Sequence, residues 1–221
     1  GSLPVNTTNR TMYEINDNSH QGSSGLISLS SLPPLTSIIA VGELKINPRR
    51  FEALEVYAGS SVPGGTLDVV KGTVIAINNS GLTLKGSTLI RANGSIVFND
   101  EVKIVVANTT RIKKRYSINE HNLNEISVGQ RISVFGSLIE EFPLQLDATF
   151  GLIRMHLSTL SGTKVDPVSV SNEDQPSFAI DLQSINGRDL NVFDFSGTGI
   201  TSENDANPNF YEIETGALDV A

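Results

Sequence analysis

Hydrophobic and polar residues alternate in short segments along most of the chain. Val102, Ile104 and Val106 share one face of such a segment, the period-two pattern of a half-buried strand. Comparable segments predict strands at 37–44, 53–58, 69–77, 82–90, 130–138, 148–157, 178–185 and 190–195. Turn-forming residues separate them, for example Asn47-Pro48. The pattern predicts an all-β protein.

The strand order in the middle of the chain resembles that of an oligonucleotide/oligosaccharide-binding (OB) barrel. Three predicted strands are followed by a short helical segment at 117–126 and then by two further strands. Ser117 is the expected N-cap of this helix, with Glu120 three residues later. We therefore expect one complete OB-like five-stranded barrel over residues 66–163.

Two stretches repeat each other about 94 residues apart. Ile39-Ala-Val-Gly42-Glu-Leu44, followed by Phe51-Glu-Ala53, recurs as Ile132-Ser-Val-Phe-Gly136-Ser-Leu138, followed by Leu146-Asp-Ala148. A glycine inside a strand at both places indicates a bulge or sharp bend that excludes a Cβ. Gly42 and Gly136 are therefore expected to have equivalent backbone roles.

The repeat suggests how the remaining residues are organised. Residues 1–34 are polar and predict a flexible leader. The alternative is that they form the degenerate front half of a first repeat. Residues 35–65 resemble the last strands of an OB-like unit, 164–176 a polar connector, and 177–221 the first strands of a unit. The terminal segments could pair with each other to close a second barrel, which we expect, or belong to a longer repeat array.

Composition narrows the classes of function. The 221 residues include no cysteine, which excludes disulfides, thiolate metal sites and cysteine nucleophiles. The net charge of −8 makes nucleic-acid binding unlikely. No stretch approaches the apolar length of a transmembrane helix. Gly1-Ser2 is typical of residual tag sequence, which is compatible with a native precursor that carries a signal or a lipid anchor.

One cationic cluster is the main candidate for ligand binding. It comprises Arg111, Lys113, Lys114, Arg115 and Tyr116. Basic side chains beside an aromatic ring could bind phosphate and stack on a base or a sugar. The alternative interpretation is a solvated strand end on an acidic protein.

An acidic segment near the C-terminus is the candidate for metal binding. Asp205, Asn207 and Asn209 place oxygen ligands at alternate positions, like the start of a calcium loop. However, Phe210 stands where such a loop requires glycine, and Asx-turns explain the same residues. We expect no cofactor, with calcium as the alternative.

No arrangement of residues predicts catalysis. The three histidines lie far apart without metal-ligand spacing, and no serine lies in a G-x-S-x-G motif. We therefore expect a protein that is not an enzyme and has no catalytic residues.

The middle of the chain resembles a known family. Lys71-Gly72-Thr-Val-Ile-Ala-Ile-Asn and Ile126-Ser-Val-Gly129-Gln130-Arg-Ile-Ser-Val-Phe-Gly136 are similar to segments of a bacterial family of uncharacterised OB-like domains. Its members occur in tandem in exported proteins and lipoproteins. The resemblance implies a location in the cell envelope (periplasm or cell surface) or outside the cell.

These observations favour a non-catalytic module that binds an unknown protein or carbohydrate partner, or that spaces other domains. Two alternatives remain open. A glycoside-type hydrolase would need paired carboxylates in a deep pocket. A single-stranded nucleic-acid-binding OB protein would bind through the cationic cluster in a salt-dependent manner.

Overall fold

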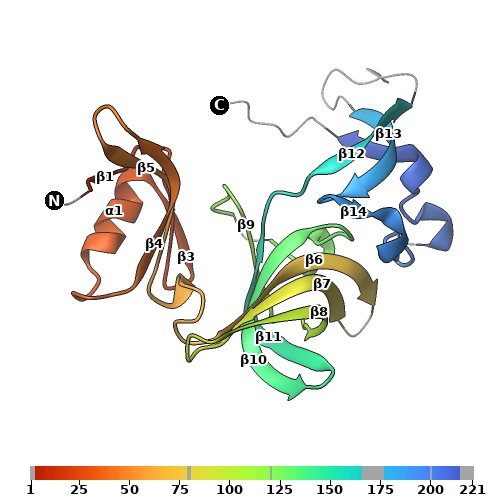
Figure 1. The fold of residues 1–221 in the computed structure, drawn as a ribbon, viewed down its shortest axis with the longest axis horizontal. Helices are drawn as coiled ribbons and strands as arrows, with labels where there is room; N and C mark the ends of the chain where they lie inside the picture. Colours follow the sequence, from red (N-terminus) through yellow and green to blue (C-terminus); the bar gives the residue numbers. More distant parts are fainter. Residues whose placement is uncertain (1–2, 79–80, 120, 166–176, 200, 215–221) are drawn as a thin grey trace.

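The computed structural model describes residues 3–78, 81–119, 121–165, 177–199 and 201–214, and it consists mostly of strands in three sheets. The expected all-β class is confirmed. Figure 1 shows the central closed sheet with a smaller sheet on either side, which we call sheet A (N-terminal) and sheet C (C-terminal). Within the described residues, no helix is long and apolar enough to cross a membrane.

Sheet A has five strands, and an α-helix packs against it. Its elements are β1 (Val5–Asn6), β2 (Met12–Ile15), β3 (Asn18–Gln21), α1 (Gly22–Ser30), β4 (Ile38–Lys45) and β5 (Arg50–Ala58). Strand β5 pairs in parallel with β1 and β2 and antiparallel with β4.

The expectation of a polar leader over residues 1–34 is wrong. Tyr13 and Ile15 of β2 are buried in the core of sheet A. Helix α1 lies so close to Tyr13 that a Cβ on Gly25 would be 2.0 Å from the Cδ2 atom of the ring. The segment folds because a few apolar residues between polar turns are enough to cover one sheet face.

The central sheet closes on itself as a barrel. Its strands are β6 (Asp68–Asn78), β7 (Gly81–Ile90), β8 (Ile96–Val105), β9 (Arg111–Lys114), β10 (Arg131–Glu141) and β11 (Leu144–Met155), preceded by the 3₁₀ turn η1 (Gly59–Ser61). The closed order is β6, β7, β8, β11, β10 and back to β6, with β8 parallel to β11, and β9 also pairs in parallel with β11. Inward-facing aliphatic side chains fill the interior, among them Val70, Leu84, Val102, Val134 and Leu146.

Gly42 and Gly136 have the equivalent roles expected from the sequence. A Cβ on Gly42 would lie 1.9 Å from the Glu52 carbonyl oxygen, and a Cβ on Gly136 2.3 Å from that of Asp147. The strand register also shifts at both positions. At each glycine the absence of a Cβ allows the carbonyl of the partner strand to come close at a shift in strand register, which is the bulge that the sequence predicted.

The predicted helix at 117–126 is wrong in extent and in its cap. In the described part of this segment, the helical structure is limited to the 3₁₀ turn η2 (Leu123–Glu125). Asn122 caps it, because its side chain accepts from the Asn124 amide (3.0 Å) while the Glu125 carboxylate accepts from the Asn122 amide (3.1 Å). Ser117 instead contacts His121, and Glu120 lies outside the described residues.

Sheet C is built around β13. Its elements are β12 (Leu160–Val165), β13 (Ser177–Ile185), β14 (Arg188–Asp189), β15 (Tyr211–Glu214) and the 3₁₀ turns η3 (Leu190–Val192), η4 (Ser202–Asn204) and η5 (Pro208–Phe210). The strand predicted at 190–195 is replaced by η3, because the Asp189 carboxylate accepts from the Asn191 amide (2.9 Å) and starts a turn.

Parts of the expected connector and tail can be placed. The connector predicted at 164–176 begins inside β12, and residues 166–176 lie outside the described residues, as do 215–221. Strand β12 was missed because four of its six side chains are exposed and its apolar residues stand only at the ends.

The expected second barrel, assembled from the N- and C-terminal segments, is also wrong. Strands β4 and β5 pair only within sheet A, and β13 pairs only within sheet C, as far as the described ladders extend. Each segment finds local partners that cover its edge, β2 for β5 and β12 for β13. Figure 1 shows sheets A and C apart, with the barrel between them.

Sheet C joins the barrel through backbone and amide hydrogen bonds. The Asn186 side chain donates to the Gly129 carbonyl (2.9 Å), and the Asp194 amide donates to the Ile75 carbonyl (2.7 Å). Ile185 packs on Gly129, where a Cβ would lie 2.8 Å from the isoleucine. The barrel therefore has an ordered contact with each of its neighbours.

Candidate functional site

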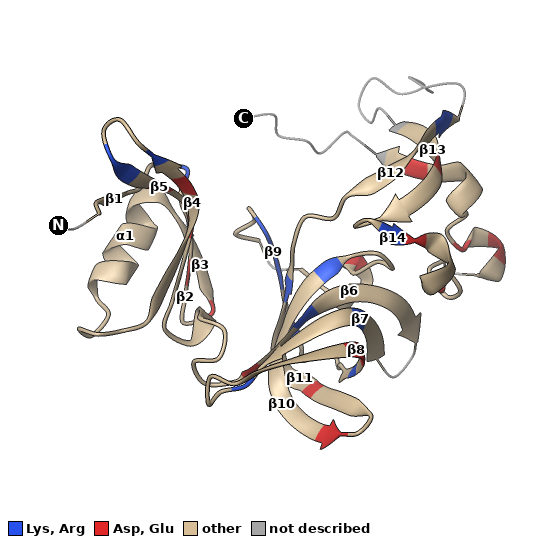
Figure 2. Cartoon of the chain, viewed as in Figure 1, with Lys and Arg blue, Asp and Glu red and all other residues tan. Residues whose placement is uncertain are grey.

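The predicted cationic cluster lies where the barrel meets sheet A. Arg111 of β9 donates from Nη2 to Asp17 Oδ2 (3.0 Å), in the turn between β2 and β3. Arg115 forms an ion pair with Glu55 of β5, and its guanidinium lies 4.7 Å from the centre of the Tyr116 ring. Figure 2 shows the basic positions along β9, on the side of the barrel nearest sheet A.

Arg154 of β11 is the most deeply buried charge at this contact. Only 3% of the residue is exposed, and its guanidinium donates two hydrogen bonds to the Glu14 carboxylate of β2. It also lies between two aromatic rings, 4.3 Å from the centre of Tyr57 and 4.8 Å from that of Phe135. A bidentate ion pair whose guanidinium also lies over two aromatic rings favours one orientation of the two sheets.

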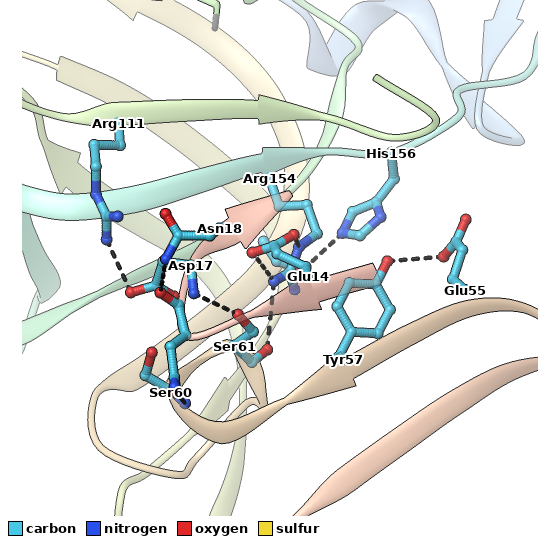
Figure 3. A network of polar contacts seen from close by, with 12 residues as sticks. Glu14, Asp17, Asn18, Glu55, Tyr57, Ser60, Ser61, Arg111, Arg154 and His156 are labelled. Atoms are coloured by element: carbon cyan, nitrogen blue, oxygen red, sulfur yellow. Dashed lines mark hydrogen bonds and ion pairs between the residues drawn. The ribbon is translucent and has the colours of Figure 1, made fainter. Parts of the chain in front are cut away.

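Glu55 is shared by two partners. It pairs with Arg115 and accepts a hydrogen bond from the Tyr57 hydroxyl (2.7 Å). Burial raises the pKa of Tyr57, so this hydroxyl stays protonated and donates at neutral pH. We call Glu14, Glu55, Tyr57, Arg115 and Arg154 the junction cluster; Figure 3 labels all of them except Arg115.

The junction cluster contains the two carboxylates that a hydrolase would need, but little space. Glu14 and Glu55 line one cavity of about 30 Å³, together with Lys113, Lys114 and Tyr116. That volume is about enough for one water molecule. Because each carboxylate is already engaged by an arginine, the arrangement supports a contact between sheets better than bond cleavage.

Two of the three predicted calcium ligands accept hydrogen bonds from backbone amides. Asp205 accepts from the Gly199 amide (2.8 Å), and Asn207 accepts from the Asn209 amide (3.0 Å) at the start of η5. The Asn207 bond is the Asx-turn of the alternative interpretation, whereas the Asp205 bond reaches back six residues along the chain. No group of three histidine, aspartate or glutamate side chains suited to a metal occurs among the described residues.

The sequence interpretation found Arg111 and Arg115 but missed Glu14, Glu55 and Arg154. Each of these three is a charged residue inside a strand with apolar neighbours, such as Ile153 and Met155 beside Arg154. A charge in that setting is buried only when it is paired, which is the signal that could have identified them.

No family model, no curated protein and no solved structure matched this chain.

Proposed function

We propose that this chain is a non-catalytic module of a cell-envelope or secreted protein, made of tandem OB-like units held in a fixed orientation to space or present a partner-binding surface. The strand order supports the OB-like assignment. A five-strand closed sheet in which the third strand runs parallel to the fifth, here β8 and β11, is the arrangement of that barrel. The resemblance to exported tandem domains supports the location.

Recurring hydrogen bonds support the tandem arrangement. The Thr11 hydroxyl donates to the Ala53 carbonyl (2.9 Å), and the Thr110 hydroxyl donates to the Ala148 carbonyl at the same distance. In both places the threonine precedes a short strand that is parallel to the acceptor strand. Sheet A therefore corresponds to the β9–β11 part of the barrel.

The exposed face of β4 also supports this correspondence. Ile38 lies four residues before Gly42 and is 53% exposed, whereas Ile132, four residues before Gly136 in β10, is 1% exposed because β6 closes the barrel beside it. We infer that a strand equivalent to β6, from an adjoining unit, covers β4.

The observation that carries the proposal is the filled, charge-neutral junction cluster. Arg154 and Arg115 each bind a carboxylate of the neighbouring sheet, so their charges serve to join units. Breaking one partner of such a pair leaves a buried charge, which costs about 3–5 kcal/mol. This cost makes bending between sheet A and the barrel unfavourable, as a spacer requires.

The rigidity of this contact can be measured directly. Because the chain has no cysteine, Ile27→Cys on α1 and Val97→Cys on β8 introduce only two sites for spin labels, both exposed. Electron double resonance should give one narrow distance distribution. Adding Glu14→Ala should broaden it, whereas Glu43→Ala, which removes an exposed carboxylate, should leave it unchanged. A broad distribution before either substitution would contradict the spacer role.

A further inference from the structure

The outer face of the barrel carries a row of polar and basic residues between the two neighbouring sheets. Ser133 of β10 stands directly opposite Lys71 of β6 on one side and Arg154 of β11 on the other. Two residues earlier on the same face of β10, Arg131 stands opposite Thr73 of β6. The alternate residues of these strands fill the barrel core, so this row projects outward.

Next to this row lies a polar groove of about 540 Å³ between the barrel and sheet C. The polar side chains that line it are Lys71, Thr73, Thr88, Arg131, Ser133, His156, Asn186 and Arg188. The lining includes no carboxylate and no phenyl or phenol ring. We call it the basic groove.

Sheet C contributes one of the cations in a defined position. Arg188 of β14 lies against Gly86 of β7, where a Cβ would be only 1.8 Å from the guanidinium Nη2. Gly86 also has a φ of 60°, a conformation that other residues rarely adopt. Glycine at this position therefore allows the guanidinium to approach the barrel wall.

The charges of the basic groove are not balanced by carboxylates of the described residues. Glu14 neutralises Arg154, but Lys71, Arg131 and Arg188 have no carboxylate within ion-pair distance among the described residues. What distinguishes these three cations is that they line one groove whose lining includes no carboxylate. Uncompensated like charges around one groove repel each other, and a bound anion would relieve that repulsion.

His156 reports on this environment. Burial, followed by the charges of Arg154, Lys71 and Arg115, lowers its pKa to about 4, so the ring is neutral at pH 7. Its Nε2 lies 2.8 Å from Ser133 Oγ, inside the groove lining. A bound anion would stabilise the charged ring, and the pKa of His156 would rise.

We propose that the basic groove binds an oxyanion group, a carboxylate, sulfate or phosphate, of a polar ligand without aromatic rings. Lys71, Arg131 and Arg188 supply the charge. The hydroxyls of Thr73 and Thr88 supply neutral hydrogen-bonding groups at the same surface. A groove of this size exceeds what a simple inorganic ion fills and lies within the range of small-molecule sites.

This inference rests on the proposed partner-binding role, since it names the ligand chemistry, but its failure is separable from that role. The spin-label distances concern sheet A and do not involve the groove. A rigid contact with an inert groove would leave the spacer intact, and a flexible contact with a binding groove would leave the ligand site intact.

The test is an NMR titration of the full-length chain with sodium sulfate, sodium phosphate and a uronic acid disaccharide, at ionic strength matched with sodium chloride. We expect saturable shifts of the His156 ring signals and a pKa for His156 that rises in the bound state. Tighter binding of the disaccharide identifies an acidic saccharide. Tighter binding of sulfate or phosphate identifies a free oxyanion, and both results support the proposal.

Variants locate the site. Arg188→Gln and Arg131→Gln should each weaken binding about tenfold, the factor that corresponds to a loss of about 1.4 kcal/mol. Lys45→Gln, which removes a cation of sheet A, should leave binding unchanged. The proposal is overturned if no probe gives a saturable shift of His156, if chloride gives the same shift, or if both groove variants, with folded spectra, bind like the parent.

Discussion

At the residue scale, Gly136 has no room for a side chain. Its missing side chain leaves room for the carbonyl of Asp147, as Gly42 does for Glu52. Neither glycine has a positive φ, so the constraint is contact with the partner strand and not backbone strain. The sequence repeat identified this pair correctly because a glycine that a bulge requires recurs at the same place in both copies.

Replacing Gly136 with valine should destabilise the barrel. The added Cβ would overlap a backbone oxygen that cannot rotate away, and such overpacking costs about 1–3 kcal/mol. Urea unfolding of Gly136→Val measures this cost. Ser137→Val adds the same branched side chain at the next, exposed position of the strand and should have little effect. Equal stability of both variants would show that the glycine is incidental.

His156 should make stability depend on pH in a defined window. Its pKa is about 4 in the folded protein and 6.5 in an unfolded chain, so the unfolded state binds more protons between these values. Stability should be fully present above pH 6.5 and fall by about 1–3 kcal/mol as pH decreases toward 4.

Urea titrations between pH 4 and 7 test this dependence. His156→Gln should flatten the curve in that window, whereas His20→Gln, in sheet A, should not. If the two variants behave alike, His156 is not responsible for the dependence.

At the element scale, the strands that the sequence predicted are those with regular alternation. Strand β9 was missed because Ile112 is its only apolar residue, and its place is determined by parallel pairing with β11. Strand β2, in a segment whose β-like character is visible in the sequence, is short, lies among polar turns and pairs in parallel with the distant β5. Such strands form through a partner distant in sequence, which local patterning does not reveal.

The candidate site was predictable only in part, for a related reason. A run of basic residues is visible in one sequence, but their partners are not. Arg115 pairs with a residue 60 positions away, and Arg154 with one 140 positions away. These pairings follow from the way the sheets meet, so the cationic segment suggested an open ligand surface.

A double-mutant cycle should reveal the coupling between β2 and β11. Arg154→Met alone should cost about 3–5 kcal/mol, since it leaves Glu14 buried without a partner. Combined with Glu14→Gln, the loss should be smaller than the sum of the single losses by about 1–3 kcal/mol. Hydrogen exchange of the β2 and β5 amides provides the measurement.

The control cycle uses an exposed pair. Lys45→Met with Glu43→Gln should show a coupling below about 1 kcal/mol. If the coupling energy of Arg154 and Glu14 is as small as that of this exposed pair, the junction cluster does not join the sheets.

At the scale of the whole molecule, the barrel should fold without its neighbours. Its main hydrophobic cluster draws only on residues 70–155, so no side chain of sheet A or C is needed to fill it. Thermal unfolding of the isolated fragment 66–162, monitored by circular dichroism, should show one cooperative transition. A broad, non-cooperative melt of this fragment would contradict the claim.

Nucleic-acid binding should be weak or absent. Two of the four cations in the segment 111–115 are engaged by carboxylates, and the net charge of −8 repels phosphate backbones. Fluorescence anisotropy with a labelled single-stranded oligonucleotide at physiological salt should show no saturable change. Tight binding that is lost in Lys113→Glu with Lys114→Glu would reverse this expectation.

The barrel meets its two neighbours through unlike surfaces. It binds the Glu14 and Glu55 carboxylates of sheet A through Arg154 and Arg115, and it accepts hydrogen bonds from sheet C at the carbonyls of Gly129 and Ile75. A contact between unlike surfaces is head-to-tail, so that repeating it gives a ring or an open filament, in contrast to a twofold contact, which ends at two copies. An assembly continued in this way would have a direction, and its length would be set by how many units the gene encodes.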